Sequence, residues 1–495
     1  MTQLNIADYF LTDRLRHGQG DRVALRGAEG TTTYAEIDAL ADSYAAALTE
    51  VGVEPEDRVF VAMPDGPDFV GAFFGILKVG AVVVMVNPAL GEDRIVELFE
   101  HCEPRALVDS SLDGGFARLS DRFDARLVTP AGRGPVDPVE AVVRDRRDPA
   151  IWLFSGGTTG VPKAVVQTHG SFVNTTRRYA HETLGYHQDD VTLSVPKLFF
   201  GYATGSNLLF PFSVGASAVV FPEHPTPDIL FELIARYKPT IMINVPTMIA
   251  AMVGHEAADR QDLSSLRFAT SAGEALPPEL YRSWKATFGV ELLDGLGTAE
   301  MWHIFITNRP GDVRAGTIGK PVAGFDVAVR EEDGEPVPDG EVGRLWVEGD
   351  SLALGYWNDS NATEEAFRGG WFVGGDLVRV DEDGYFEHHG RADDRLKVGG
   401  KWLAPQEVES CLLEHDAVDA AVVVGVPNEA GLVKPVAFVV AVEPPDGLAE
   451  DLMSWVLERL EPYKHPRRVY VIDELPKTHL GKVDRTKLKK LAEPG

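Results

Sequence analysis

The sequence is poor in cysteine and has no long uninterrupted hydrophobic run. Only two of its 495 residues are cysteines, Cys102 and Cys411, and they lie far apart in the chain. Two cysteines cannot build a disulfide framework, so a reducing, cytoplasmic environment is expected. The longest apolar stretch, residues 70–86, contains Lys78 and three glycines and is shorter than the roughly 20 residues of a spanning helix. It is predicted to be a core helix followed by a buried strand. The N-terminal residues also lack the basic and apolar regions of a signal peptide.

Basic residues are scarce relative to acidic ones. The 47 lysines and arginines are outnumbered by 76 aspartates and glutamates, which gives a formal net charge of −29 at pH 7. Because the mean field of such a chain repels phosphates, we expect neither nucleic acid nor a membrane as partner. An anionic ligand must therefore be held by a local pocket. With 44% hydrophobic residues, the chain is long enough for two to four compact units of roughly 100–200 residues each.

The first part of the chain alternates helix-like and strand-like segments. Helical apolar spacing at residues 34–51 is followed by a strand pattern at 58–63 and by a second helical pattern at 68–79. Short β-rich runs follow at 80–86 and 105–109. This alternation, which continues as far as residue 271, predicts layered α/β sheets with mainly parallel, buried strands.

From about residue 319 the pattern changes to short strands separated by turns. Asp-Gly pairs at 333–334, 339–340 and 383–384 are typical of hairpin turns and predict a β-rich subdomain. Mixed helical and strand patterns return after residue 391. We therefore expect a large N-terminal α/β domain over residues 1–392, which includes the β-rich part, and a small, mobile α+β domain over residues 393–495.

A loop rich in glycine and hydroxyl residues follows the apolar run IWL. The segment FSGGTTGVPK, residues 154–163, contains three glycines, three hydroxyl residues and a lysine. Backbone N–H groups of such a loop converge on phosphate oxygens, and the hydroxyl groups and the cation assist. It is not a Walker A loop, because Pro162 separates Gly160 from Lys163. Taken alone, the segment is equally compatible with a flexible surface loop.

This loop is the first of six segments that occur in a fixed order along the chain. They are SGGTTGVPKAVVQTHG, SAGEALP, DGLGTAEM, GWFVGGD, GRADDRLKVGGKWLAPQEVE and PKTHLGKVDR, spread over residues 155–485. Together they resemble the motifs of the adenylate-forming superfamily, which includes acyl-CoA synthetases, peptide-synthetase adenylation domains and luciferases. Segments 195–216 and 300–325 are most similar to the benzoate-CoA ligase group. The resemblance implies an AMP-forming acid-thiol ligase that uses ATP, Mg²⁺ and coenzyme A to activate an aromatic carboxylic acid as acyl-AMP and then form its thioester.

The same resemblance implies which residues hold the nucleotide and the metal. The β- and γ-phosphates are expected at Thr158, Thr159, Gly160 and Lys163. Thr298 is expected to contact the α-phosphate and Glu300 to hold Mg²⁺, which proteins bind through few carboxylates plus phosphate oxygens. The remaining nucleotide contacts are expected at Gly273 and Glu274 for adenine, Asp376 for the ribose hydroxyls, and Arg391 beside them.

Further residues are implied for the acid, the thiol and the domain movement. Lys482 resembles the mobile lysine that reaches the acid carboxylate and the α-phosphate, and Asp393 resembles the hinge between the domains. Gly399 and Gly400 are expected to line the channel for the pantetheine arm, where absent side chains leave room. The expected acid pocket comprises Tyr202, Ala203, His303 and Ile304, with Lys197 and Phe199 near the carboxylate end.

Several points of the resemblance leave alternatives open. The sequence departs from the family motifs at three positions. It has Gly156 where a hydroxyl residue is usual, Ala164 where Gly is usual, and Gly374 where Thr is usual. A stand-alone enzyme that passes its aryl-AMP to a carrier-protein phosphopantetheine or another nucleophile shares the first half-reaction. A catalytically silent ligand-binding protein is a further alternative, against which the joint presence of the charged motif residues speaks. The ring substituents of the acid and the choice between monomer and homodimer stay open.

Overall fold

The computed structural model describes residues 3–109, 117–123, 125–128, 136–155, 163–398, 401–427, 432–441, 444–476 and 483–492. Residue contacts divide the chain into two compact units. The first unit comprises residues 1–327 and 347–373, and the second comprises residues 328–346 and 374–495. In the described ranges, every helix is too short or too polar to cross a membrane. The boundary expected at residue 393, between a large domain and a small, mobile one, stays a prediction.

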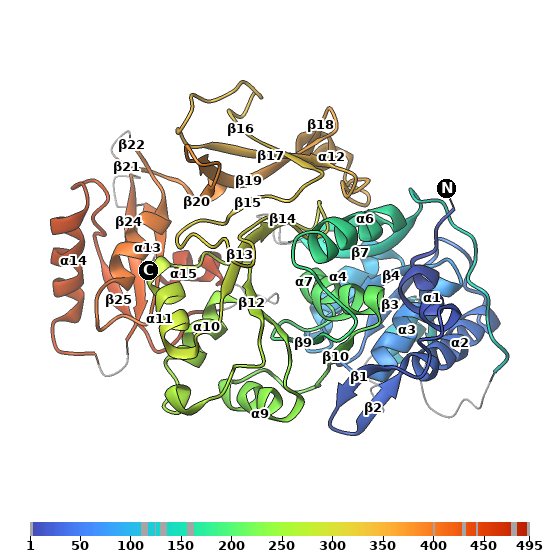
Figure 1. Cartoon of the computed structure of the whole chain (residues 1–495). Coiled ribbons are helices and arrows are strands. Elements are labelled where there is room, and N and C mark those ends of the chain that lie inside the picture. The colour runs from blue at the N-terminus through green and yellow to red at the C-terminus, as the bar shows by residue number, and fades with distance from the viewer. Residues whose placement is uncertain are drawn as a thin grey trace. The chain divides into compact units, whose positions relative to one another are not determined.

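One layer of the first unit is a six-stranded sheet with the order β6-β5-β3-β4-β7-β8. Its strands are β3 (Arg58–Ala62), β4 (Val82–Met85), β5 (Ala106–Asp109), β6 (Arg126–Val128), β7 (Pro149–Ser155) and β8 (Lys163–Thr168). Strands β3, β4 and β7 of this sheet are labelled in Figure 1. All neighbours are parallel except β7 and β8. Helices α2 (Tyr34–Glu50), α3 (Pro67–Lys78) and α4 (Glu92–Cys102) accompany it. The core on one face of this sheet includes Phe60, Phe99 and Trp152.

The second sheet of the first unit has nine strands in the order β15-β14-β13-β12-β11-β9-β10-β1-β2. They are β1 (Val23–Gly27), β2 (Gly30–Thr33), β9 (Val191–Ser194), β10 (Ser217–Val219), β11 (Ile241–Asn244), β12 (Phe268–Ser271), β13 (Leu292–Gly297), β14 (Ile304–Thr307) and β15 (Lys320–Pro321). Neighbouring strands from β13 to β1 in this order are parallel. At the two ends of the sheet, β2 is antiparallel to β1, and β14 is antiparallel to β13 and β15. Helices α9 (Pro227–Tyr237), α10 (Pro246–Val253) and α11 (Pro278–Phe288) pack on its core, which contains Leu193, Met242 and Trp284. The predicted layered α/β fold is confirmed.

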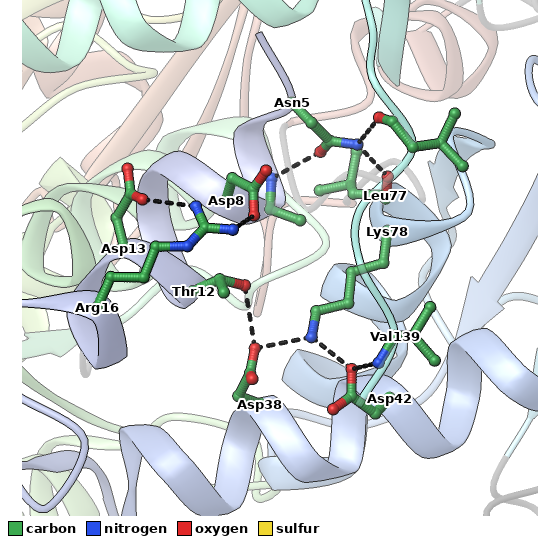
Figure 2. Close-up of polar contacts among 12 residues, drawn as sticks. Asn5, Asp8, Thr12, Asp13, Arg16, Asp38, Asp42, Leu77, Lys78 and Val139 are labelled. Carbon is green, nitrogen blue, oxygen red and sulfur yellow. Dashed lines mark hydrogen bonds and ion pairs between the residues drawn. The ribbon is translucent and has the colours of Figure 1, made fainter. Parts of the chain in front are cut away.

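A buried polar cluster ties the N-terminal helices to the rest of the first unit (Figure 2). The ammonium group of Lys78, at the end of α3, lies 2.8 Å from a carboxylate oxygen of Asp38 and 2.5 Å from one of Asp42. Both aspartates are on α2, four residues apart and therefore on one helix face. The Thr12 hydroxyl donates to Asp38, and the Val139 N–H donates to Asp42, each at 3.1 Å. The cluster thus joins four segments that are distant in sequence.

The middle of the chain forms a five-stranded sheet with the order β16-β17-β19-β18, in which β20 also pairs with β19. The strands are β16 (Phe325–Arg330), β17 (Gly343–Gly349), β18 (Phe367–Arg368), β19 (Trp371–Val380) and β20 (Phe386–Arg391), and helix α12 spans Ser360–Ala366. The division into units passes through β16, β17 and β19. The expected turn at 383–384 connects β19 and β20, with Gly384 at a φ of 81°.

The C-terminal part of the second unit is α+β, as expected. Strands β23 (Ala420–Pro427), β24 (Val433–Val440) and β25 (Val469–Val471) form one sheet, and β21 (Leu396–Val398) pairs with β22 (Lys401–Leu403). Helices α13 (Pro405–Leu413), α14 (Leu448–Arg459) and α15 (Arg485–Ala492) complete it. Arg485, at the start of α15, lies 2.9 Å from the Glu409 carboxylate of α13 and donates to the Val423 carbonyl of β23 at 2.7 Å. These contacts hold the helix that directly follows Lys482.

Candidate active site

The expected phosphate loop lies between β7 and β8. Thr158, Thr159 and Gly160 are outside the described residues, but both flanks of the loop are described. Ser155 at the end of β7 pairs with Lys163 at the start of β8. The Lys163 ammonium lies 4.7 Å from the ring centroid of Tyr356, which is cation–π distance. The lysine is thus anchored at a strand end, directly after the loop.

Thr298 and Glu300 lie in a tight turn that follows β13. Gly297 opens this turn, and a Cβ there would lie 2.5 Å from the carbonyl oxygen of His303, so only glycine fits. The Thr298 hydroxyl accepts a hydrogen bond from the Met301 N–H at 3.3 Å. The Glu300 side chain is buried, and one of its oxygens accepts a hydrogen bond from the Tyr356 hydroxyl at 2.8 Å. Tyr356 therefore brings Glu300 and Lys163 to one place.

The donor set around Glu300 fits a magnesium ion that is also bound by phosphate. No group of three or more His, Cys, Asp or Glu side chains in the described ranges is arranged to hold a metal ion. Glu300 also forms no ion pair within the described part of the chain. One buried carboxylate without a cationic partner is what Mg²⁺ requires when phosphate oxygens and water supply its other ligands. The residues present therefore fit Mg²⁺ with a nucleotide and do not fit a metal bound by protein alone.

Gly273 and Glu274 lie between β12 and α11. Gly273 has a φ of +90°, and the space where its Cβ would stand is open. The Glu274 carboxylate accepts hydrogen bonds from Thr247, at 2.7 Å from the hydroxyl and 3.2 Å from the N–H. The side chain of Glu274 thus holds the start of α10, and the open backbone at Gly273 is the surface available to a flat ligand.

The expected acid pocket is assembled around His303. Helix α7 (Gly201–Thr204) carries Tyr202 and Ala203, and β14 begins at Ile304. The His303 Nε2 lies 3.1 Å from the Tyr202 carbonyl oxygen and 3.2 Å from the Ser206 hydroxyl. Ala203 and Ile304 are buried, and the ring centroid of Tyr202 is 5.5 Å from that of His303. Four of the predicted pocket residues therefore form one contiguous group.

Burial keeps the His303 imidazole neutral. It lowers the pKa of this group to about 4, because the charged form is poorly solvated there. Since a carbonyl only accepts, Nε2 carries the proton that is donated to Tyr202, and Nδ1 has no hydrogen-bond partner among the described residues. The aromatic rings of Tyr179, Phe210 and Trp302 surround the imidazole, with centroids 4.8–5.5 Å away. The site is therefore mainly aromatic, with one bare acceptor nitrogen.

Lys197 and Phe199 lie in the segment that follows β9. The Lys197 ammonium donates to the Phe221 carbonyl at 2.7 Å and lies over the ring of the same residue. Burial lowers the pKa of Lys197 to about 8, and the nearby Asp65 carboxylate opposes this shift. Phe199 packs against the neighbouring ring of Phe200 at 4.4 Å. The printed contact of Lys197 is thus with Phe221, and its expected place at the carboxylate end of the pocket stays a prediction.

Sequence reasoning missed Asp65, which supports the same segment. Both oxygens of its buried carboxylate accept from the Leu198 N–H, at 3.0 and 3.2 Å. Burial raises the pKa of Asp65 to about 7, against the opposing charge of Lys197. Gln167 was also missed, and its amide donates to the carbonyls of Ala299 and Glu300 at 2.7 and 3.1 Å. In the sequence, Asp65 could have been noticed as a single acidic residue shortly after the buried strand β3.

In the second unit, Asp376 and Arg391 are directly opposite each other in the β19–β20 pair. The Asp376 carboxylate lies 3.0 Å from His388 Nε2, and Arg391 lies 3.8 Å from Asp393 in the turn that follows β20. Asp393 is half exposed. Gly399, Gly400 and Lys482 lie outside the described residues. The structure therefore brings together the two residues expected at the ribose and the residue expected at the hinge.

Comparisons with known proteins show the family to which the chain belongs. Residues 12–357 match the AMP-binding enzyme family and residues 407–482 match the AMP-binding enzyme C-terminal domain. The benzoate–CoA ligase of Thauera aromatica is 39% identical over 98% of this chain and 95% of its own. A benzoate CoA ligase structure from Burkholderia xenovorans is 38% identical over 98% of this chain and all of its own, with a TM-score of 0.91. An anthranilate CoA ligase solved with anthranoyl-AMP is 35% identical over all of this chain and 98% of its own, with a TM-score of 0.93. The chain therefore belongs to the AMP-binding enzyme family, within the adenylate-forming superfamily.

Proposed function

We propose that the protein is an ATP- and Mg²⁺-dependent aryl-CoA ligase. It activates an aromatic carboxylic acid of the benzoate type as acyl-AMP with release of pyrophosphate, and then transfers the acyl group to coenzyme A. The observation that carries this proposal is the turn at residues 298–303, which contains both Glu300 and His303. A charged nucleotide site and an aromatic pocket thus share one short segment, as activation of an aryl acid by ATP requires. The full-length likeness to ligases of benzoate and anthranilate supports it.

In the first half-reaction, a carboxylate oxygen of the acid attacks the α-phosphorus while pyrophosphate leaves on the opposite side. Negative charge grows on the departing oxygen and must be met by fixed cations and hydrogen-bond donors. Lys163 supplies such a cation at the end of the phosphate loop, Thr298 supplies a hydroxyl, and Glu300 would hold the metal. Mg²⁺, when bound there, would neutralise charge on the triphosphate. The neutral His303 and the rings around it exclude water from the acid and keep the acyl-AMP from hydrolysis.

The second unit supplies the remaining groups in this proposal. Asp376 accepts from the ribose hydroxyls, and Arg391 lies beside it. Lys482 approaches the carboxylate and the α-phosphate for adenylation and then withdraws. The small domain, residues 393–495, turns about Asp393, and Gly399 and Gly400 line the passage for the pantetheine thiol. The half-exposed position of Asp393 in a short turn is compatible with a change of backbone angles there.

The test is a panel of aryl and alkyl acids, each supplied with ATP, Mg²⁺ and free coenzyme A. AMP and acyl-CoA are scored together by mass spectrometry. We expect an aryl acid to give both products in equal amounts, and the panel then ranks the ring substituents that fit. Aryl-AMP without thioester would redirect the search to a carrier-protein phosphopantetheine or another nucleophile as acceptor. The absence of AMP release with every acid would refute an adenylating activity.

A further inference from the structure

Tyr356 lies between the two charged residues of the nucleotide site, although none of the recognised motifs contains it. Its hydroxyl donates to a carboxylate oxygen of Glu300 at 2.8 Å. The face of its ring lies 4.7 Å from the Lys163 ammonium. The three residues come from the start of β8, the turn after β13 and the segment before α12. One side chain therefore touches both the expected phosphate ligand and the expected metal ligand.

The backbone around Tyr356 is fixed by the strand that Lys163 begins. The Leu354 N–H donates to the Val166 carbonyl, and the Val166 N–H donates to the Gly355 carbonyl, both at 3.0 Å. Tyr356 itself bridges to Val165 of β8 in antiparallel fashion. Its own N–H donates at 3.0 Å to the hydroxyl of Thr363, in the middle of α12. The ring therefore has a position that is set by β8 on one side and by α12 on the other.

The main chain of Glu300 is fixed separately. Its carbonyl accepts from the Ala353 N–H at 2.8 Å and from the Gln167 amide at 3.1 Å. What is left to be set is the direction of the Glu300 carboxylate. The Tyr356 hydroxyl sets it, and because this donor is neutral, it occupies one oxygen without cancelling the negative charge. The charge remains available to a cation.

Tyr356 contacts two opposite charges, the Lys163 ammonium through its ring and the Glu300 carboxylate through its hydroxyl. A lysine and a glutamate close together in a buried site would otherwise pair and so withdraw from a ligand. A ring face offers the ammonium a weaker, undirected attraction, which a phosphate oxygen readily replaces. We propose that Tyr356 is a positioning residue that orients Glu300 toward Mg²⁺ and keeps Lys163 apart from it until Mg-ATP binds. This inference rests on the proposed function, because it assumes that the site takes Mg-ATP.

Calorimetric titration of the full-length protein with ATP, in the presence and absence of Mg²⁺, tests the proposal without turnover. Tyr356→Phe removes only the hydroxyl and keeps the ring over Lys163. We expect it to weaken binding of Mg-ATP about tenfold, the usual effect of losing one hydrogen bond to a charged group, and to leave binding of metal-free ATP unchanged. Tyr356→Leu also removes the ring face and should in addition alter binding of metal-free ATP. Tyr237→Phe is the matched control, since its hydroxyl donates to the Gly27 carbonyl, also at 2.8 Å, and its affinities should equal those of the wild type.

A double-mutant cycle with Glu300→Gln distinguishes positioning from a structural effect. In the Glu300→Gln background, Tyr356→Phe should cause no further loss of Mg-ATP affinity. Equal losses with and without Mg²⁺, an unchanged affinity in Tyr356→Phe, or additive effects in the double variant would each overturn the proposal. A wild type that binds Mg-ATP but converts no acid would refute the proposed function alone. A wild type whose ATP binding does not depend on Mg²⁺ would refute both.

Discussion

Replacing Lys78 by methionine would remove the cation of the cluster in Figure 2 while keeping a buried chain of similar length. The Lys78 side chain is 2% exposed, and the side chains of its partners Asp38 and Asp42 are 12% and 6% exposed. In the variant, two carboxylates would stay in this interior without a counter-charge. Each would keep one hydrogen bond, from Thr12 and Val139 respectively.

The expected loss follows from this burial. Removing one partner of a buried ion pair typically costs about 3–5 kcal/mol, because the remaining charge is desolvated and unpaired. The nearby Arg16 provides a contrast within the same figure. Its guanidinium lies 2.8 Å from Asp13 and 3.1 Å from Asp8, but its side chain is 55% exposed. Exposed pairs contribute about 0–1 kcal/mol. The two sets of ion pairs have similar distances, but because their burial differs, we expect very different losses of folding free energy when the cation is removed.

Urea unfolding of the full-length variants, followed by circular dichroism, measures the difference. With an unchanged slope, the midpoint shift multiplied by that slope gives the loss of unfolding free energy. We expect about 3–5 kcal/mol for Lys78→Met and less than about 1 kcal/mol for Arg16→Met. Adding Asp38→Asn and Asp42→Asn to Lys78→Met should recover most of the loss, because neutral amides need no counter-charge. A Lys78→Met variant as stable as Arg16→Met, or a triple variant without recovery, would refute this reasoning.

Three further predictions concern catalysis and pH. Lys482→Ala should abolish adenylation but leave thioester formation from supplied aryl-AMP largely intact, and equal loss of both half-reactions would contradict the proposed movement of the small domain. Asp393→Pro should preserve pyrophosphate release and slow thioester formation, because proline restricts φ at the hinge; unchanged thioester kinetics would remove Asp393 from this role. Burial raises the pKa of Asp65 from 3.8 to about 7, so the protonated carboxyl favours the folded state at low pH and that advantage is lost as the pH rises through 7. The melting temperature of Asp65→Asn, relative to the wild type, should therefore increase between pH 5 and pH 8, and a constant difference would show that Asp65 does not titrate in this range.

The sequence predicted those parts of the fold that depend on local periodicity. The helix expected at 68–79 is observed at Pro67–Lys78, and the strand expected at 58–63 is observed at Arg58–Ala62. Both elements are buried, so their hydrophobic pattern carries a strong signal. Strand order could not be read in this way. Strand β9 lies between β10 and β11, and this placement depends on packing between segments that are remote in sequence.

The site divides in the same manner. Lys163 and Glu300 could be proposed from the sequence because they stand in motifs, whereas Tyr356 is 56 positions from Glu300 and reaches it only through tertiary packing. Asp38 and Asp42 give a related case. On a helix predicted from apolar spacing, two acids four residues apart indicate a solvated face, and only the approach of α3 turns that face into the binding site of a buried lysine. Of the contacts in this structure, those that neutralise or hydrogen-bond a buried charge are therefore the hardest to predict from sequence patterns.

The turn that joins the nucleotide side to the acid side has an unusual backbone at Trp302. This residue has a φ of +64°, which is costly for a large side chain, and its ring is almost fully buried. The ring packs edge to face on Phe172 at 4.3 Å and on Phe210 at 5.6 Å. Removing a buried aromatic ring typically costs about 3–5 kcal/mol, whereas such a backbone angle costs about 1–3 kcal/mol, so packing of this ring stabilises the turn more than the angle destabilises it. Because His303 directly follows this residue and Glu300 precedes it by two positions, we expect a change in the packing of Trp302 to alter the proposed acid pocket and the proposed metal ligand together.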